Sequence, residues 1–310
     1  MTCKMNISRE DVIWCYETFL GRSPENEEAI RGHLAAAASG DWKALIKTFL
    51  HSEEFSGNFS SIVAAGPFAK LARLPRYTPV TIQLSEKNFL VADGPSFFGT
   101  YLEIFRNEIY KFSSKTERPI IIDCGANIGV SVAYFKQLFP KCKIIAIEAD
   151  PKIFHLLEEN IIISGFNDVT LLQKAISHQT NPIFFYSEGA DAGRIGTPFQ
   201  QDGVPISIET IQLDDLIEGP VDFLKIDIEG AEVDVLLVCQ KLDQVNHLFV
   251  EYHSFSKTPQ RLHELLTFLA SKGFRYYMTT VFSQKEPFVQ TLEHLGFDLQ
   301  LNISCVRIDK

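Results

Sequence analysis

The 310-residue sequence predicts a doubly wound α/β domain preceded by a small all-α bundle. Up to about residue 56 the apolar residues follow a helical period only, whereas beyond residue 80 apolar strands alternate with helices of ten or more residues. The strands are continuously apolar, which is typical of a parallel sheet covered on both faces. We therefore expect a helical bundle at 1–58, a linker at 59–80 and the α/β domain at 81–310.

Three helices are predicted in the N-terminal bundle. Ser8 followed by Asp11 forms a capping-box pattern that starts the first helix. Ser23-Pro24 stands in the preferred cap and first-turn positions of a second helix. A third helix is predicted over 42–50. A core of this size is marginally stable alone.

The α/β domain is predicted to begin with a hairpin at 80–93 and a helix at 101–112. Five apolar, β-branched strands follow, at 119–123, 143–148, 169–174, 221–227 and 247–252. Helices are expected between most of them, including 151–163 and 258–272. An inserted hairpin (183–187 and 205–210) and two late strands (274–279 and 302–308) complete the pattern.

Composition excludes several classes of protein. Hydrophobic residues make up 45% of the chain and charged residues 22%, as in folded globular proteins. The formal net charge of -10 disfavours a nucleic-acid partner or an anionic membrane. The six cysteines are scattered without a CxxC pair, no apolar run approaches membrane-span length, and the N-terminus does not resemble a signal peptide. We expect a cytoplasmic protein without a membrane span.

The strongest local motif is PIIIDCGANIGVSVAYF, a buried strand that ends at Asp123 and turns through Gly125 and Gly129 into a helix. Glycines at such a turn let a ligand approach the backbone. The spacing Gly-x-x-x-Gly differs from the dinucleotide pattern Gly-x-Gly-x-x-Gly, and a carboxylate at Asp123 would repel a pyrophosphate. We expect a cation-bearing ligand such as S-adenosylmethionine. The alternative is a turn that serves helix–strand packing only.

A second carboxylate, Glu148, ends the next strand about 20 residues further on. This position suits a group that accepts hydrogen bonds from the hydroxyls of an adenosine ribose. It would serve a dinucleotide equally well, so it does not discriminate between cofactors. The alternative is a solvated carboxylate at a strand end.

The motif VDFLKIDIEGAEVDVL carries Lys225, Asp227 and Glu229 to the end of another strand, and the following strand carries Glu251 and His253. Burying these charges is costly without partners, so the pattern indicates a site in one crevice. The ordinary pKa of a histidine suits proton transfer near neutrality. Asp227, Glu251 and His253 are also candidate ligands of a divalent metal ion. The alternative is a salt-bridge network around Lys225.

Five motifs in this order, IIDCGANIG, IEADP, IETIQLDDL, LKIDIEGAE and VEYHS, resemble the FkbM-type methyltransferases over about residues 97–308. The resemblance implies a Rossmann-like methyltransferase fold, with a seven-stranded, mostly parallel sheet whose last strand is antiparallel. It also implies S-adenosylmethionine as cofactor and methyl transfer to a hydroxyl of a sugar, glycolipid, polysaccharide or polyketide-like acceptor. The phrases CYETFLGRSPENEEA and SEEF resemble a small helical domain of unknown function that often accompanies enzymes of glycan metabolism.

The resemblance also implies roles for individual residues. Cofactor binding falls to Asp123, Gly125, Ala126, Asn127, Gly129, Glu148 and Ala149, with Lys174 and Ala175 near the adenine. Catalysis on the acceptor falls to His253, Asp227, Glu229, Glu251 and Lys225. A divalent metal is possible but not favoured.

Two other functions stay open at this point, an NAD-dependent oxidoreductase and a catalytically silent, glycan-associated binding module. We expect a hydroxylated small-molecule or glycan partner and no nucleic acid. The Gly-rich segment 187–201 either shapes the acceptor pocket, through Asp191 or Arg194, or is a plain loop.

Overall fold

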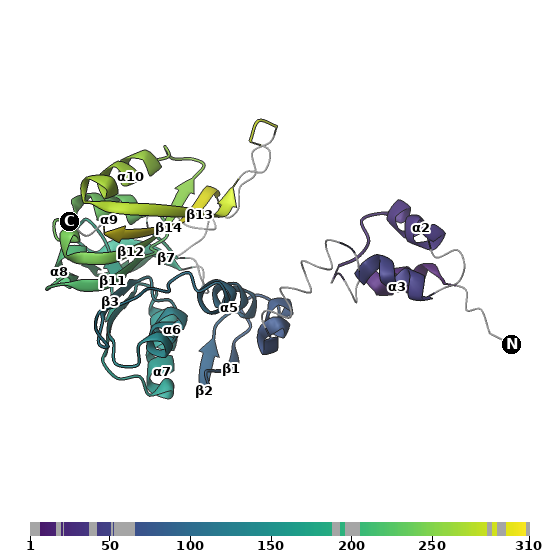
Figure 1. Cartoon of the computed structure of the whole chain (residues 1–310), viewed down its shortest axis with the longest axis horizontal. Helices are drawn as coiled ribbons and strands as arrows, with labels where there is room; N and C mark the ends of the chain where they lie inside the picture. The colour runs from purple at the N-terminus through teal and green to yellow at the C-terminus, as the bar shows by residue number, and fades with distance from the viewer. Residues whose placement is uncertain are drawn as a thin grey trace. The chain divides into compact units, whose positions relative to one another are not determined.

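The computed structural model describes residues 7–16, 20, 22–36, 42–50, 52, 66–187, 193–195, 205–283, 287–289 and 296–307. The chain divides into two compact units, Met1–Lys70 and Leu71–Lys310, which are coloured along the chain in Figure 1. The division falls inside the segment expected as a linker, where the 3₁₀ helix η2 (Gly66–Arg73) forms. The domain bounds expected from the sequence stay a prediction.

The N-terminal unit contains α1 (Arg9–Cys15), α2 (Glu27–Ala36) and α3 (Trp42–Leu50). The capping box at Ser8 and Asp11 is confirmed. The second helix begins later than Ser23-Pro24, because the side chain of Asn26 accepts hydrogen bonds from the amides of Glu28 and Ala29. The buried core of this unit consists of Val12, Cys15, Tyr16, Ile30, Leu45 and Phe49.

The second unit is built on a seven-stranded sheet with the strand order β13-β14-β12-β11-β3-β4-β5. The strands are β3 (Ile120–Cys124), β4 (Lys143–Glu148), β5 (Val169–Gln173), β11 (Val221–Ile226), β12 (Val245–Phe255), β13 (Phe274–Ser283) and β14 (Phe297–Arg307). Only β14 runs antiparallel to its neighbours β12 and β13. This is the predicted Rossmann-like sheet with an antiparallel last strand.

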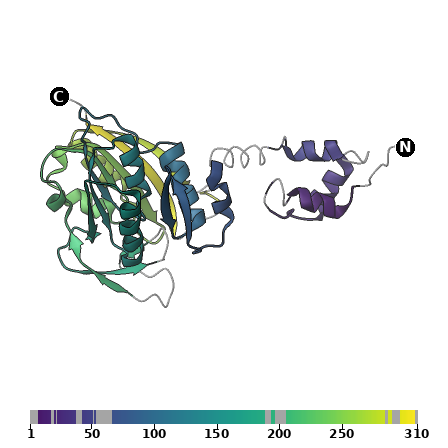
Figure 2. The ribbon, with the colours of Figure 1, turned by 90° about the horizontal axis from the view of Figure 1, so that it is seen from below.

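Helices cover both faces of the sheet. They are α5 (Gly94–Tyr101), the π-helix η3 (Leu102–Arg106), α6 (Val130–Leu138), α7 (Pro151–Ser164), α8 (Leu213–Leu216), α9 (Glu232–Val238), the 3₁₀ helix η4 (Leu242–Gln244) and α10 (Leu262–Ser271). Figures 1 and 2 show α6 and α7 on one face and α9 and α10 on the other. Right-handed crossovers that run outward in both directions from β3 and β11 produce this arrangement.

The helix predicted over 101–112 is displaced in the structure. Asp93 caps α5 through its side chain, and the helical segment ends at Arg106. Beyond it, the aromatic side chains of Tyr110 and Phe112 pack against Phe223, with ring centroids 6.2 and 4.9 Å away. The apolar residues of this segment are therefore explained by burial of a loop, although their pattern in the sequence is similar to that of a helix.

Three smaller sheets complete the unit. The predicted first hairpin is confirmed as β1 (Val80–Leu84) with β2 (Lys87–Val91). The predicted insertion is also confirmed, since β7 (Ile183–Ser187) pairs antiparallel with β8 (Gly193–Ile195) and β9 (Ile206–Ile208). β6 (Ala175–Ile176) and β10 (Thr210–Ile211) form a short parallel pair. Asp191 lies outside the described residues, as does the side chain of Arg194.

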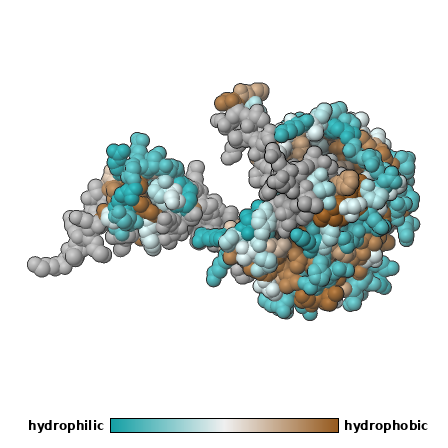
Figure 3. All heavy atoms as spheres, turned by 180° about the vertical axis from the view of Figure 1, so that it is seen from behind, coloured by the Kyte–Doolittle hydropathy of each residue, from teal (hydrophilic) through white to brown (hydrophobic). Residues whose placement is uncertain are grey.

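The core of the second unit fills the space between the sheet and its helices with residues such as Leu224, Ile226, Leu236 and Val250. In the face drawn in Figure 3, polar and apolar residues are mixed on the surface of this unit. Within the described parts of the chain, no helix is long and apolar enough to cross a membrane.

Candidate active site

The turn between β3 and α6 is packed so tightly that only glycine fits at two of its positions. Gly125 has φ of 83°, and a Cβ there would lie 1.9 Å from the carbonyl oxygen of Asp227. Gly129 has φ of 92°, and a Cβ there would lie 2.8 Å from Leu157 Cδ1. Part of the glycine pattern is therefore explained by packing, as the alternative interpretation held. Between the glycines, Ala126 and Asn127 present the turn to a cavity.

A lysine cluster lies directly behind this turn and consists of Asp123, Lys225, Asp227 and the Gly125 carbonyl. Lys225 Nζ donates a hydrogen bond to the Gly125 oxygen at 2.6 Å. The same nitrogen lies 3.1 Å from Asp227 Oδ2 and 3.4 Å from Asp123 Oδ1. Burial opposes its charge, but these carboxylates raise the pKa of Lys225 well above its ordinary value. Lys225 is thus a cation that ties the turn to the end of β11.

The position of Asp123 differs from the expectation. Its carboxylate is fully buried, accepts a 2.5 Å hydrogen bond from Ser131 Oγ and faces Lys225. Asp123 is not among the residues that line the cavity, because its side chain is directed toward Ser131 and Lys225. A direct contact between Asp123 and a cofactor stays a prediction, and the acidity of the cavity comes from other residues.

A histidine cluster lies at the end of the neighbouring strand and consists of Glu229, Glu232, Glu251 and His253. His253 Nδ1 lies 3.0 Å from Glu232 Oε1, within hydrogen-bond distance. His253 Nε2 lies 3.7 Å from Glu251 Oε1 and 3.9 Å from Glu229 Oε2. The imidazole is almost completely buried and does not line the cavity, whereas Glu229 and Glu251 do.

These surroundings change the protonation expected for His253. Burial lowers the pKa of His253, but Glu229, Glu232 and Glu251 together raise it well above its ordinary value. Burial raises the pKa of both Glu229 and Glu251 to about 8. The carboxylates therefore favour the imidazolium, and a role of His253 in proton transfer stays a prediction.

Glu232 is a site residue that we did not predict from the sequence. One oxygen of this fully buried carboxylate accepts hydrogen bonds from the amides of Ile228 and Gly230, at 3.2 and 2.9 Å, as well as contacting His253. Glu229 between these amides has φ of 56°, a left-handed conformation that is costly for a non-glycine residue. Glu232 thus holds the loop that directs Glu229 toward the cavity.

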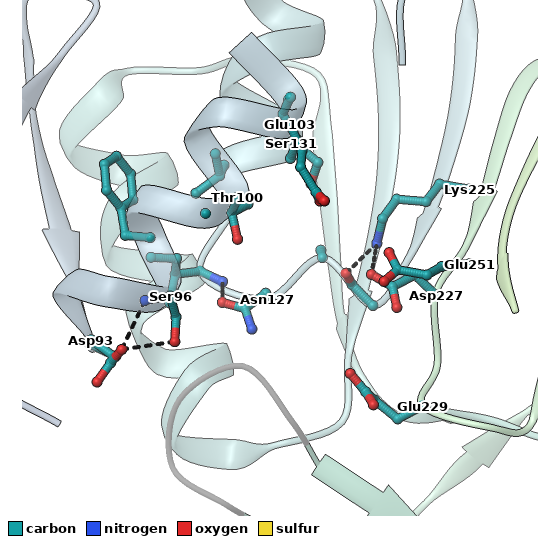
Figure 4. Close-up of a pocket in the computed structure, with 18 of the residues that line it drawn as sticks. Asp93, Ser96, Thr100, Glu103, Asn127, Ser131, Lys225, Asp227, Glu229 and Glu251 are labelled. Atoms are coloured by element: carbon teal, nitrogen blue, oxygen red, sulfur yellow. Dashed lines mark hydrogen bonds and ion pairs between the residues drawn. The ribbon is translucent and has the colours of Figure 1, made fainter. Parts of the chain in front are cut away.

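The cavity has a volume of about 510 Å³ at the carboxyl ends of β3, β11 and β12. Five carboxylates line it, namely Asp93, Glu103, Asp227, Glu229 and Glu251, together with the cations Arg76 and Lys225. Figure 4 shows Lys225, Asp227 and Glu251 close together, with Glu229 nearby and α5 on the opposite side. The structure thus brings Lys225, Asp227, Glu229 and Glu251 together at one cavity with Gly125, Ala126 and Asn127, as predicted.

The helical side of the cavity was not predicted. Ser96, Thr100 and Glu103 line it from α5 and η3. Their spacing of four and three residues places them on one helical face. The sequence does contain a signal for this helix, namely the cap sequence Asp93-Gly94-Pro95 followed by polar residues at this spacing. The signal was missed because the helix was expected to begin only at residue 101.

The remaining predicted cofactor residues lie beside the cavity rather than in it. Glu148 Oε2 accepts a hydrogen bond from the amide of Asn127 and Oε1 one from Asp150, at 2.9 and 2.8 Å. Burial raises the pKa of Glu148 to about 7, against the effect of these hydrogen bonds. Ala149 and Ala175 belong to a small apolar cluster, and Lys174 pairs with Glu209 at 3.2 Å. Only Glu148 is joined to the cavity, through Asn127.

A metal ion would find a different set of ligands from the one expected. One ligand atom each of Asp227, Glu229 and His253 lies within 4.8 Å of the others, whereas the expected set contained Glu251. Two carboxylates and an imidazole are suitable ligands for a divalent ion. A neutral His253 would be required, and its three carboxylate neighbours favour the protonated ring.

Comparisons with known proteins agree with this geometry. The sequence pattern of the methyltransferase FkbM domain matches residues 123–276. Methyltransferase sdnD of Sordaria araneosa is 28% identical, covering 44% of this chain and 66% of that protein. The 2-O-methyltransferase NoeI of Sinorhizobium fredii (strain NBRC 101917 / NGR234) is 30% identical, covering 43% and 63%. The chain thus spans less than two thirds of the length of either relative.

Among solved structures, M. jannaschii TYW2 in complex with AdoMet is similar with a TM-score of 0.40 and 14% identity, covering 76% of this chain and 89% of that one. The matched residues include the turn after β3, the carboxylates after β11, and Glu251 and His253 of β12. Residues 123–276 of this chain are therefore a methyltransferase FkbM domain.

Proposed function

We propose that this chain is an S-adenosylmethionine-dependent O-methyltransferase that acts on a hydroxyl of a sugar, glycolipid, polysaccharide or polyketide-like acceptor. The observation that carries the proposal is the acidic cavity against the Gly125–Ile128 turn, with five carboxylates and two cations in its lining. Such a lining favours a cationic ligand and repels a diphosphate. The 2-O-methyltransferase activity named for NoeI supports transfer to oxygen.

The residues present suit this cofactor, which supplies a methyl group already activated on a sulfonium ion. Both oxygens of Glu148 accept backbone hydrogen bonds, yet a carboxylate has further lone pairs for the hydroxyls of a ribose. The turn at Gly125–Asn127 brings backbone to the cavity wall. Asp227 provides negative charge for the cationic part of the ligand, and Glu229 adds to it when it is ionised, above a pKa of about 8.

Glu251 is the residue we assign to removal of the proton from the acceptor hydroxyl. It lines the cavity, whereas the imidazole of His253 lies behind it and is held as a cation. His253 then orients Glu229 and Glu251, and Lys225 fixes the turn. A pKa raised to about 8 makes Glu251 a stronger base than an ordinary carboxylate. Orientation and exclusion of water supply the rest of the rate enhancement.

A metal ion that polarises the hydroxyl is the main alternative within this function. We expect activity to survive exhaustive chelation, because Glu232 and the neighbouring carboxylates hold His253 in its protonated form. Turnover that disappears with chelator and returns with Mg²⁺ or Mn²⁺ would instead assign Asp227, Glu229 and His253 to a metal site.

The test of the proposal is transfer of labelled methyl groups from S-adenosylmethionine to neutral glycans, glycolipids, polysaccharide fragments and polyketide alcohols. We expect label in at least one class, at oxygen. Cofactor binding without transfer to any class would favour the silent binding module. An acceptor RNA that took the label would overturn the prediction of no nucleic-acid partner, which the net charge of -10 supports.

A further inference from the structure

The helical wall of the cavity, formed by Ser96, Thr100 and Glu103, lies outside residues 123–276, the part of the chain that matches the family pattern. Figure 4 shows these three side chains along α5 and η3, across the cavity from Asp227 and Glu251. The matched part of the chain supplies the turn and the strand ends, whereas this wall is supplied by the segment before the first strand of the sheet. The residues of this helical wall can therefore determine which acceptor the cavity binds.

The polar groups of this wall differ in how far they are already satisfied. Asp93 is buried and accepts hydrogen bonds from the amide and the hydroxyl of Ser96, at 2.9 and 2.8 Å, and from Arg76 at 3.0 Å. Glu103 has no ion pair or side-chain hydrogen bond within the described residues, and its electrostatic neighbours Asp227 and Glu251 carry the same charge. Asp93 thus caps the start of α5, whereas the carboxylate of Glu103 can accept a hydrogen bond from a ligand.

Glu103 also faces the catalytic side of the cavity. Burial, and to a smaller extent Asp227, raises the pKa of Glu103, and Glu103 in turn raises the pKa of Glu251. Three carboxylates from three separate elements therefore line one cavity, and among the described residues Lys225 is within ion-pair distance of Asp227 but not of Glu103 or Glu251. Such an arrangement is unfavourable unless a ligand donates hydrogen bonds into it. Hydroxyl groups donate such bonds, whereas phosphate and carboxylate groups add repulsion.

We propose that Glu103, supported by the hydroxyl of Thr100, is a specificity-determining residue that accepts a hydrogen bond from a second hydroxyl of the acceptor. It selects uncharged polyhydroxylated acceptors over those with a phosphate or carboxylate near the methylated position. This inference rests on the proposed function of the cavity. It adds the residue that recognises the acceptor and the charge class that the residue excludes.

The experiment measures binding of simple sugars to the full chain by saturation-transfer-difference NMR at pH 8.5, with S-adenosylhomocysteine present. The probes are the methyl glycosides of glucose, mannose, galactose, rhamnose and fucose, and the 6-phosphates of the first three. The variants are Glu103→Gln, Thr100→Val and the control Glu108→Gln. Glu108 follows η3 closely but is exposed and pairs with Lys111.

We expect at least one neutral glycoside to bind and its 6-phosphate to bind at least ten-fold more weakly. Glu103→Gln should weaken the neutral glycoside about ten-fold, as for the loss of a hydrogen bond to a charged group. The same variant should strengthen binding of the 6-phosphate. The ratio of the affinity for the neutral glycoside to the affinity for its 6-phosphate should therefore fall. Thr100→Val should weaken the glycoside less, and Glu108→Gln should change neither.

Three outcomes would overturn the inference: no glycoside binds, the phosphates bind as well as the glycosides, or Glu103→Gln behaves like Glu108→Gln. A separate titration of S-adenosylhomocysteine into each variant distinguishes this failure from failure of the proposed function. If the cofactor product binds normally while the sugar preference is absent, only the role of Glu103 is wrong. If the cofactor product does not bind at all, the proposed function itself fails.

Discussion

The lysine cluster and the histidine cluster lie at the ends of adjacent strands, β11 and β12, and each places a buried cation among carboxylates. In the lysine cluster the ammonium of Lys225 contacts its partners at 2.6–3.4 Å, and one of them is the carbonyl of Gly125. In the histidine cluster Glu232 is the one carboxylate within hydrogen-bond distance of His253, at 3.0 Å, and the cavity carboxylates lie at 3.7 and 3.9 Å. The amide of Gln300, 3.3 Å from His253 Nε2, also donates a hydrogen bond to Glu251.

This difference separates a structural ion pair from a functional one. Lys225 neutralises the fully buried Asp123 and fixes the turn, so its charge is committed to the fold. His253 stabilises Glu229 and Glu251 from a greater distance, and both of these carboxylates line the cavity. The second cluster therefore retains carboxylate oxygens for an acceptor. Substitutions should affect stability in the first cluster and turnover in the second.

The largest effect is expected from Lys225→Met, which leaves Asp123 buried without a cation. Breaking a buried ion pair in this way costs about 3–5 kcal/mol, which would lower the Tm by about 10 °C. The matched control is Lys136→Met, because buried Lys136 donates to the carbonyls of Cys142 and Asn167 and has no carboxylate partner within the described residues. Thermal unfolding should show a smaller loss for the control and partial recovery when Asp123→Asn is added to Lys225→Met. Equal losses in both lysine variants would contradict the account.

The next largest effect concerns turnover. Glu251→Gln should lower kcat by about 10²–10⁴-fold if Glu251 removes the proton, with little change in cofactor affinity. The pKa of about 8 predicts that wild-type kcat rises as the pH passes 8, because only the ionised carboxylate accepts a proton. The variant should lose this rise. Glu264→Gln, at a half-buried residue paired with Arg261 away from the cavity, should retain both the rate and the pH profile.

A smaller effect is expected from the residues that support Glu251. Glu232→Gln and His253→Asn should each lower kcat by about ten-fold, since they disturb the orientation of Glu229 and Glu251 without removing the base. The affinity for S-adenosylhomocysteine should stay within a few-fold of the wild-type value. If His253→Asn loses as much activity as Glu251→Gln and the pH profile disappears with it, the proton acceptor is His253.

The smallest effect concerns Glu148, a carboxylate held by backbone amides and outside both clusters. Its pKa is raised from 4.5 to about 7, so the folded state binds the proton more tightly than the unfolded state. The stability that this provides is present below pH 4.5 and is lost as the pH rises through 7. Glu148→Gln should therefore gain Tm relative to the wild type at pH 8.5, by a few degrees, but not at pH 4.5. A gain at pH 4.5 that is equally large would contradict the shift.

Much of the fold follows from local patterns. β4 was predicted to the residue, because its β-branched run is bounded by a charged residue at each end. The predicted range 151–163 agrees with α7 within one residue, and the structure shows Asp150 capping its start and Gly165 ending it. The start of α2 was not, since Asn26 competes with Ser23-Pro24 as a cap and only tertiary packing decides between them.

The candidate site was partly predictable for a related reason. Parallel strands place their carboxyl ends at one edge, so Asp227, Glu229 and Glu251 could be assigned to one cavity before the structure was known. The direction in which a single side chain points could not be predicted in this way. In the structure the side chain of Asp123 faces Lys225. Glu103 and Glu232 were missed because their roles depend on how a helix packs against the strand ends, which periodicity does not encode.

The central claim, that the acidic cavity binds a cationic methyl donor and excludes a diphosphate, is tested most directly by calorimetric titration. S-adenosylmethionine, S-adenosylhomocysteine and NADH are titrated separately into the wild-type chain. The account predicts one-to-one binding of the first two ligands at micromolar concentrations and no heat from NADH. Binding of NADH, or absence of binding by both adenosyl compounds at millimolar concentration, would contradict it.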